Sequence, residues 1–561
     1  MNDSVTENGQ NRVSDRLLTI SGLRIDGLTA EIWQPIVKGI DLSLNRGEVL
    51  GLIGESGAGK STIGLSAMGY VRPGCRISDG SIVFDGMELT NAPPDQLRDI
   101  RGRRVAYVAQ SAAAAFNPAH RLINQFAEAP VQHGVMSYKQ AAEEGVALFG
   151  ALDLPEPDAI GFRYPHQVSG GQLQRAMTAM AMACQPDLIV FDEPTTALDV
   201  TTQIEVLAAI RNIVREHHTA AIYVTHDLAV VAQMADRIMV LRYGELVEEK
   251  DTRALLAEPE KAYTSDLLSV RTFVREAAIE RPDVDPLLQI TDLDAYYNDF
   301  HALKNIDLRV PRGQTTAVVG ESGSGKSTLA RAITGLLEPA NGRIVFDGED
   351  LPASHKDRQR DQLRRIQLIY QSPDTALNPR QRVGEVIGRP LSFYLGLTGD
   401  KRKARVAELL EMIELPTEFA SRRPDELSGG QKQRICIARA LAAEPELIIC
   451  DEVTSALDAL VSEEILKLLQ RMQDELSVSY LFITHDLATV KAISDDMVVM
   501  LQGEIVEQGT RHDVLSPPHH AYTEKLLSSV PEMNPDWLDD VLAERAARKA
   551  RGETVLESAD Q

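Results

Sequence analysis

Residues 54–62 read Gly54-Glu55-Ser56-Gly57-Ala58-Gly59-Lys60-Ser61-Thr62, and residues 320–328 repeat the pattern as Gly320-Glu321-Ser322-Gly323-Ser324-Gly325-Lys326-Ser327-Thr328. Both stretches fit the phosphate-binding loop pattern G-x-x-x-x-G-K-[ST]. Each follows an apolar run typical of a buried strand and leads into a segment with helical periodicity, which is the context that this motif requires. The sequence therefore predicts two sites for nucleotide phosphates.

The residue types of this loop suit phosphate chemistry. Glycines let the backbone turn its N–H groups toward a phosphate, and the N-terminus of the following helix adds positive potential. Lys60 and Lys326 are predicted to reach the β- and γ-phosphates. The hydroxyls of Ser61 and Ser327 are predicted to hold Mg²⁺.

The chain contains an internal duplication. The two loops lie 266 positions apart, and a constant offset of 259 relates later pairs, namely Ser169 and Ser428, Asp192 and Asp451, and His226 and His485. We expect duplicated domains, with the first copy's few extra residues in a longer surface loop at about 71–79. The predicted order is a disordered start (1–15), a first domain (16–269), a charged linker (270–286), a second domain (287–531) and a charged tail (532–561).

Composition narrows the class of protein. A chain of 561 residues is too long for one core, and its net charge of −24 argues against nonspecific binding to nucleic acid. No apolar run approaches the ~20 residues of a membrane helix, and no signal peptide opens the chain, so we expect a cytosolic protein. The cysteines form no cluster, which predicts free thiols and no zinc or iron–sulfur site. In the tail, an apolar stripe predicts a helix that packs on the surface or frays: Trp537, Leu538, Val541 and Leu542.

The fold class follows from continuous apolar runs that alternate with helical segments, such as Leu188–Phe191 and Leu447–Cys450. Runs without polar alternation are typical of a parallel sheet covered on both faces, so the predicted class is α/β. Each of these two runs ends in paired acids, Asp192-Glu193 and Asp451-Glu452. At the carboxyl end of a strand the aspartates suit a Mg²⁺ shell, and the glutamates suit polarising an attacking water.

A second glycine motif precedes another helical segment in each copy. The first reads Val168-Ser169-Gly170-Gly171-Gln172 and the second reads Leu427-Ser428-Gly429-Gly430-Gln431. A Ser-Gly-Gly at a helix start is a second anion site, although an N-cap alone would explain the serine. With both phosphate loops present, the chain resembles the ATP-binding-cassette (ABC) ATPases, whose signature is L-S-G-G-Q.

The resemblance implies two tandem P-loop domains, each with a RecA-like parallel core, an antiparallel β subdomain and a helical signature subdomain. It also implies a head-to-tail pair in which each ATP lies between one domain's phosphate loop and the other's signature. Lys60, Ser61, Asp192 and Glu193 would then face Ser428 and Gly430, and Lys326, Ser327, Asp451 and Glu452 would face Ser169 and Gly171.

Further residues match family elements by position. Gln110 and Gln371 match the Q-loop glutamine, which contacts Mg²⁺ and senses the transport partner. Asp199 and Asp458 match the D-loop, and His226 and His485 match the histidine that contacts the γ-phosphate. The resemblance assigns catalysis to Glu193, Glu452, His226 and His485, and Mg²⁺ to Ser61, Gln110, Asp192, Ser327, Gln371 and Asp451.

The adenine contact differs between the copies. Tyr297 fits the stacking aromatic of the second copy, whereas the same register in the first copy gives Glu31, with Trp33 nearby. No catalytic residue is missing from either copy, so two competent sites are expected.

Two features resemble the oligopeptide/dipeptide/nickel importer group of this family. An Asn-Pro pair follows each Q-loop, and each copy ends in a Tyr-Thr segment, at 262–268 and 520–527. Fused ATPase subunits of this kind are similar to those of glutathione and peptide importers. The resemblance implies two membrane permease subunits, through which any membrane contact would run, and a periplasmic solute-binding protein. It implies a place on the cytoplasmic face of a bacterial inner membrane and no iron–sulfur cluster. It favours peptides as substrate, with nickel, opines or glycosides as alternatives.

Three other classes remain open. A soluble twin-cassette ATPase acting on ribosomes shares the duplication, but it usually has a long charged linker, and the net charge of −24 fits ribosomal RNA poorly. A DNA-repair cassette would carry a coiled coil or zinc cysteines, which are not visible here. A purely structural nucleotide-binding module would not need Glu193 and Glu452.

Overall fold

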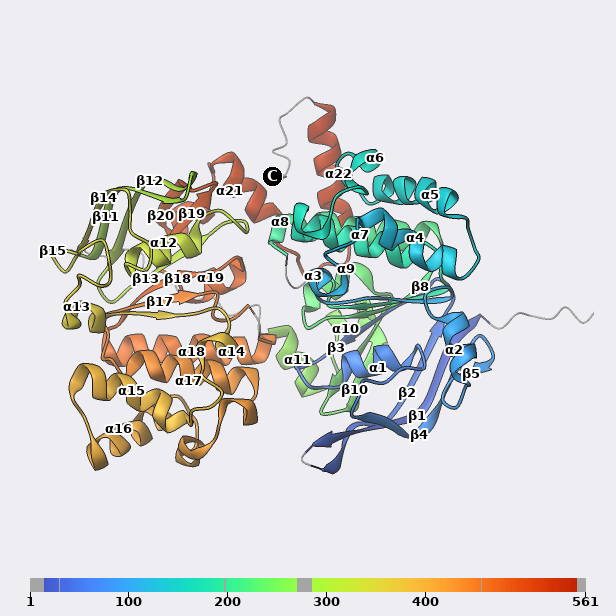
Figure 1. Ribbon diagram of the computed structural model, residues 1–561, viewed down its shortest axis with the longest axis horizontal. Helices are drawn as coiled ribbons and strands as arrows, with labels where there is room; N and C mark the ends of the chain where they lie inside the picture. The colour runs from blue at the N-terminus through green and yellow to red at the C-terminus, as the bar shows by residue number, and fades with distance from the viewer. Residues whose placement is uncertain (1–14, 30, 196–197, 270–284, 456, 552–561) are drawn as a thin grey trace, which may run out of the picture.

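The computed structural model describes residues 15–29, 31–195, 198–269, 285–455 and 457–551. It contains two domains of the same architecture that lie side by side (Figure 1). The predicted disordered start and the linker fall largely on residues 1–14 and 270–284, which lie outside the described residues. None of the helices in the described ranges combines the length and the apolar character needed to cross a membrane.

The first domain has a six-stranded sheet at its centre, in the order β10-β9-β3-β8-β7-β6. Its inner strands pair in parallel and only β10 runs antiparallel, against β9. Every residue of β3, β7 and β8 is buried, as the continuous apolar runs predict. The strands are β3 (Val49–Ile53), β6 (Val105–Val108), β7 (Leu188–Asp192), β8 (Ala220–Val224), β9 (Arg237–Arg242) and β10 (Glu245–Asp251).

A second, antiparallel sheet of the first domain has the order β2-β1-β4-β5. Its strands are β1 (Arg16–Thr29), β2 (Ile32–Asn45), β4 (Cys75–Phe84) and β5 (Met87–Glu88). The expected long loop at 71–79 is wrong for most of its length, because residues 75–79 extend β4. Cys75 and Ile77 alternate with polar residues there and pair with Gly27 and Ile25 of β1, so the extra residues lengthen a strand.

Helices cover the parallel sheet of the first domain. A group from residue 112 to residue 182 carries the signature and packs through a core that includes Phe126 and Phe149. The helices are α1 (Lys60–Ser66), α2 (Pro94–Ile100), α3 (Ala112–Ala115), α4 (Leu122–Gln132), α5 (Tyr138–Ala151), α6 (Pro157–Ile160), α7 (Gly170–Met182), α8 (Val200–Glu216), α9 (Leu228–Met234), α10 (Thr252–Ala257) and α11 (Ala262–Ser269).

The second domain repeats both sheets, in the orders β12-β11-β14-β15 and β16-β17-β18-β13-β19-β20. Its strands are β11 (Pro286–Tyr297), β12 (Phe300–Pro311), β13 (Thr315–Val319), β14 (Asn341–Phe346), β15 (Glu349–Asp350), β16 (Ile366–Ile369), β17 (Leu447–Asp451), β18 (Ser479–Ile483), β19 (Asp496–Leu501) and β20 (Glu504–Thr510). Its helices are α12 (Lys326–Ile333), α13 (Arg360–Arg365), α14 (Pro373–Ala376), α15 (Val383–Leu395), α16 (Gly399–Met412), α17 (Gly429–Leu441), α18 (Ala459–Leu476), α19 (Leu487–Ile493), α20 (Arg511–Leu515) and α21 (Ala521–Ser528). The predicted α/β class is confirmed in both halves.

The last helix, α22 (Trp537–Ala550), crosses back to the first domain and stands beside its helices (Figure 1). Trp537 and Leu538 are buried in the same hydrophobic cluster as the core of the first domain. The amide nitrogen of Gln233 on α9 donates to the carbonyls of Glu532 and Asn534, at 2.9 and 2.8 Å. The apolar stripe of the tail therefore covers the other domain, and the two halves are joined at a contact far from the linker in sequence.

Candidate ATP sites

Each phosphate loop joins a buried strand to a helix, β3 to α1 and β13 to α12. The first glycine of each loop has a backbone conformation that only glycine adopts readily, with φ of 144° at Gly54 and 152° at Gly320. A Cβ at Gly54 would lie 2.0 Å from the carbonyl oxygen of Leu241, and one at Gly320 would lie 2.2 Å from that of Met500. Close packing against the neighbouring strand therefore explains why glycine opens both loops.

The loop lysines are buried and turned into their own loops. Nζ of Lys60 donates to the carbonyls of Gly54 and Glu55 at 2.7 and 2.9 Å. Lys326 makes the same pair of bonds to its own loop at 2.8 and 2.7 Å. Burial lowers the pKa of both lysines, and nearby carboxylates oppose that shift. Two ammonium groups are thus positioned inside the loops, where they can meet phosphate oxygens.

The serine after each lysine faces the strand-end aspartate. Oγ of Ser61 donates to Oδ1 of Asp192 at 2.7 Å, and Oγ of Ser327 donates to Oδ1 of Asp451 at 3.1 Å. Hydroxyl and carboxylate oxygens are the ligand types that Mg²⁺ prefers, so each serine–aspartate pair fits that ion. Burial raises the pKa of Asp451.

The glutamate after each aspartate stands at the centre of a small network. Oε2 of Glu193 accepts from the amide of Gln110 at 2.8 Å, and its Oε1 lies 3.1 Å from Nδ1 of His226. In the second domain the amide of Gln371 donates to Glu452 at 2.6 Å, and Nδ1 of His485 lies 3.3 Å from the same carboxylate. Sequence reasoning paired these glutamines with Mg²⁺ and these histidines with phosphate, and it missed that both contact the glutamate.

Both glutamates also have left-handed backbone conformations, with φ of 49° at Glu193 and 50° at Glu452. A non-glycine residue in this region stores about 1 to 3 kcal/mol of strain, and such strain is common at functional positions. Burial disfavours charge on His226 and His485, but the hydrogen bond and charge of the partner glutamate outweigh it and raise the pKa of each imidazole. The pKa of Glu452 is lowered, because His485 outweighs the effect of burial.

The D-loop regions link the two domains. Asp199 and Asp458 cap α8 and α18, accepting from the backbone nitrogens of Thr202 and Val461. Oδ2 of Asp458 also accepts, at 3.4 Å, from the backbone nitrogen of Ser56 in the phosphate loop of the first domain. On the other side, Oγ1 of Thr201 donates to Glu321 in the second loop at 2.8 Å. Each loop thus meets the D-loop region of the opposite domain.

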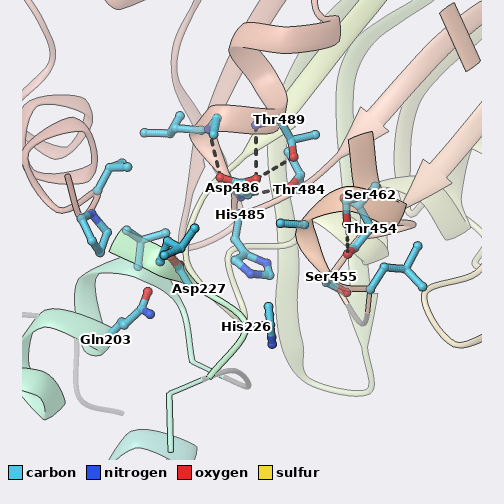
Figure 2. Close-up of a pocket in the computed structure, with 18 of the residues that line it drawn as sticks. Gln203, His226, Asp227, Thr454, Ser455, Ser462, Thr484, His485, Asp486 and Thr489 are labelled. Atoms are coloured by element: carbon cyan, nitrogen blue, oxygen red, sulfur yellow. Dashed lines mark hydrogen bonds between the residues drawn. The ribbon is translucent and has the colours of Figure 1, made fainter. Parts of the chain in front are cut away.

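One cavity of about 890 Å³ joins both sites. It is lined by residues of both phosphate loops together with the polar groups predicted for catalysis and binding, including Gln110, Glu193, Asp199, His226, Gln371, Glu452, Asp458 and His485. The two histidines also face a smaller cavity of about 200 Å³ between the domains, where His226 and His485 lie close to each other (Figure 2). Beside them, Asp486 caps α19 and accepts from the hydroxyl of Thr489 at 2.6 Å.

The signature serines, unlike most residues of the phosphate loops, are not among the described residues that line the larger cavity. Ser169 and Ser428 are exposed and cap α7 and α17, each in a capping box with the glutamine three residues later, Gln172 or Gln431. A Cβ at Gly171 would lie 2.2 Å from Cγ2 of Thr202, so this glycine allows the signature helix to pack on α8 of its own domain. Contact between a signature and the opposite phosphate loop stays a prediction.

The expected adenine contacts also differ. Tyr297 lines the larger cavity, and its hydroxyl accepts from the guanidinium of Arg331 at 3.1 Å. In the first domain the guanidinium of Arg76 lies 4.2 Å from the centre of the Trp33 ring, which covers that ring. Ile36 lines the cavity on this side, whereas Trp33 is not among its lining residues.

Comparison with known proteins agrees with this geometry. The ABC transporter family matches residues 37–196 and 303–455, and the family described as the oligopeptide/dipeptide transporter C-terminal region matches residues 506–553. A glutathione import ATP-binding protein, GsiA, from Salmonella choleraesuis strain SC-B67 is 38% identical, over 92% of this chain and 90% of that protein. GsiA from Escherichia coli O6:H1 is 37% identical, over 92% of this chain and 90% of that protein.

A solved structure of cbiO1 from Clostridium perfringens, part of the ABC transporter complex cbiONQ, is 34% identical and has a TM-score of 0.38, covering 41% of this chain and 91% of its own. The family match spans both domains, and the relatives share nearly the whole length of the chain. The chain therefore belongs to the ABC transporter ATPases, as a two-domain member of the oligopeptide/dipeptide group, and it binds and hydrolyses ATP.

Proposed function

We propose that this chain is the motor subunit of a bacterial importer, in which ATP binding and hydrolysis at two composite sites drive the uptake of peptides. The relatives named as glutathione import proteins and the match to an oligopeptide/dipeptide C-terminal region support an importer of small peptides. Two separate membrane permease subunits would form the pathway, and a periplasmic binding protein would deliver the solute. The chain would then act on the cytoplasmic face of the inner membrane.

The proposal depends on one observation: each phosphate loop is contacted by a residue of the opposite domain. Asp458 of the second domain bonds to the phosphate loop of the first, and Thr201 of the first bonds to the loop of the second. A nucleotide that contacts groups from both domains favours the closed arrangement, and its hydrolysis removes that preference. ATP turnover at such a site becomes a motion between domains, which a membrane partner can use.

The side chains divide the reaction between them. Lys60 and Lys326 would bind the phosphates, and Glu193 and Glu452 would orient the attacking water. Gln110 and His226 hold Glu193 from both sides, so its carboxylate has one orientation. Phosphoryl transfer needs mainly this positioning and the neutralisation of charge.

Mg²⁺ would be held by two sets of residues, Ser61, Asp192 and Gln110 in the first site and Ser327, Asp451 and Gln371 in the second. When bound, the ion would neutralise charge on the β- and γ-phosphates. The signature groups, Ser169 and Gly171 on one side and Ser428 and Gly430 on the other, would complete each site when the domains close further.

The test is purification of the tagged chain from gently solubilised membranes of its host, followed by identification of the proteins that accompany it. Two polytopic permease subunits, and ATPase activity stimulated by a periplasmic peptide-binding protein, are the expected result. A double variant, Glu193→Gln with Glu452→Gln, should keep the same partners and bind ATP but lose turnover. Recovery of ribosomes in place of permeases would overturn the importer and favour a soluble twin-cassette ATPase.

A further inference from the structure

The two strand-end aspartates, which both copies of the motif predict to be equivalent, have different surroundings. Asp192 accepts at both of its oxygens, from Ser61 at Oδ1 and from the phenol of Tyr107 at Oδ2, each at 2.7 Å. Among the residues that the structure describes, Asp451 accepts a hydrogen bond only from Ser327, at the longer distance of 3.1 Å. The first carboxylate is therefore held at two points and the second at one.

The sheet register shows that this difference comes from one position. Tyr107 lies on β6 and pairs with Val190 of β7, two residues before Asp192. The equivalent pair in the second domain is Leu368 of β16 with Ile449 of β17, two residues before Asp451. Leu368 packs against the hydrophobic cluster of its domain and offers no donor. The copies thus differ by one phenol at the same place beside the aspartate.

A neighbouring loop adds a positive charge near Asp192. Nη2 of Arg72 lies 3.9 Å from Oδ2 of Asp192, and Arg72 lines the nucleotide cavity. Arg72 precedes Pro73, and in the second copy the residue before the matching Pro339 is Glu338. The guanidinium is largely exposed, so its direct contribution is small, and Asp451 has a cation of its own nearby in Arg331.

A carboxylate turns easily about its last torsion, which has a broad energy profile. Two donors at opposite oxygens restrict that torsion, and one donor leaves it freer. Mg²⁺ requires near-ideal octahedral geometry, and outer partners that orient its ligands typically change metal affinity by about 10- to 100-fold. An oriented carboxylate should therefore bind the ion more tightly than one that must be ordered on binding.

We propose that Tyr107 is a positioning residue for the metal-shell carboxylate Asp192, and that it makes the two ATP sites unequal, the first binding divalent metal with nucleotide more tightly than the second. The inference rests on the proposed role of Asp192 and Asp451 in holding Mg²⁺. It assigns the inequality to Tyr107 and Leu368, since the loop lysines, the serines that follow them and the strand-end glutamates are the same in both sites.

The test measures Mn²⁺ binding by electron paramagnetic resonance in the full-length protein with a non-hydrolysable ATP analogue. In a Lys326→Ala background, which leaves the first site, Tyr107→Phe should raise the Mn²⁺ dissociation constant about tenfold. Binding of the analogue in EDTA should stay unchanged. The matched control is Tyr70→Phe, a half-exposed tyrosine that contacts Arg101 and not the aspartate, and it should leave Mn²⁺ binding unchanged.

Unchanged Mn²⁺ affinity in Tyr107→Phe would overturn the inference and leave the importer proposal standing. Failure of the Lys326→Ala protein to bind any nucleotide would show that the two sites cannot fill independently, and the wild-type isotherm would then decide the inference. The wild-type isotherm gives an independent answer, because it should contain two classes of Mn²⁺ site, and Tyr107→Phe should bring them together. A wild-type isotherm with a single class would also overturn the inference, whether or not the variant folds.

Discussion

Oδ2 of Asp458 lies 3.4 Å from the backbone nitrogen of Ser56, although the two residues are 402 positions apart. The same aspartate caps α18 through its other oxygen, which accepts from the nitrogen of Val461 at 3.1 Å. One carboxylate therefore starts a helix in the second domain and reaches the phosphate loop of the first. Its charge also opposes the burial effect on the pKa of Lys60.

Substitutions at Asp458 should separate these two roles. Asp458→Ala removes both, and the lost N-cap should destabilise the protein by about 1 kcal/mol. Asp458→Ser keeps a capping oxygen but is too short to reach Ser56, so its unfolding temperature should stay close to wild type. ATPase activity should fall about tenfold in both variants, the value expected for the loss of a hydrogen bond to a charged group. Full activity in Asp458→Ser would show that the contact between domains is dispensable.

Removal of one loop lysine should affect one site. Lys60 donates to carbonyls of its own loop, and Lys326 donates to carbonyls and to the hydroxyl of Ser324 in its own loop, although both loops line one cavity. Lys60→Ala or Lys326→Ala should therefore reduce the number of tightly bound ATP molecules from two to about one. The number is measured by equilibrium dialysis, in a protein that also carries Glu193→Gln and Glu452→Gln so that ATP is not hydrolysed. Loss of both ATP molecules from either single variant would mean that the sites cannot fill independently.

The α/β fold and the place of each phosphate loop between a strand and a helix could be predicted from the sequence, because the patterns that indicate them are local. A strand of buried residues, a glycine loop and a helix follow one another within about 20 residues, at 49–66 and again at 315–333. The alternation of Cys75 and Ile77 with polar residues is also a local signal, but the nearby Pro73, Gly74 and Gly80 led to the wrong expectation of a loop.

Contacts between distant segments could not be predicted in the same way. The bond from Tyr107 to Asp192 depends on β6 and β7 being neighbours in the sheet, and 85 positions separate the two residues. The apolar stripe of α22 predicts a covered helix face but does not specify which surface covers it. The networks around Glu193 and Glu452 likewise join three separate strand ends, and no short motif states how those ends meet.

Stability should depend on pH through the histidine–glutamate pairs. The pKa values of His226 and His485 are raised in the folded protein from the ordinary value of 6.5, so each pair stabilises the fold fully below about pH 6.5. That contribution is lost as the pH rises through the raised pKa of the folded state. The Glu193→Gln and Glu452→Gln double variant lacks the charged partners, so the difference in unfolding temperature from wild type should be largest near pH 6 and shrink toward pH 9.

The measurement is a series of thermal unfolding curves between pH 6 and pH 9. Glu349→Gln, in an exposed strand of the second domain, is the control and should show no pH-dependent difference from wild type. A constant difference would show that the imidazoles are neutral throughout this range, and a difference that grows with rising pH would show that their pKa values are lowered in the folded protein.

The contact between α22 and the first domain should hold the two halves of the chain together stably. Leu538 is fully buried there, its backbone nitrogen donates to Oε1 of Gln233 at 3.1 Å, and Arg253 makes two hydrogen bonds to Asp536, at 3.0 and 2.5 Å. Leu538→Ala should cost about 2 to 5 kcal/mol of local stability, the usual range for a buried leucine. Since about 1.4 kcal/mol corresponds to a factor of ten, hydrogen exchange in α22 should accelerate at least about 30-fold. The measurement is hydrogen exchange read by mass spectrometry of the peptides that contain residues 537–548.

The partly buried Leu542 on the same helix is the matched control, and Leu542→Ala should have a smaller effect on this exchange. Because α22 is covalently part of the second domain, its release would leave the linker and the contacts at the ATP sites to hold the halves together, and exchange should then also rise in α9, where Gln233 lies. Equal exchange rates in wild type and Leu538→Ala would show that α22 is not held by this contact.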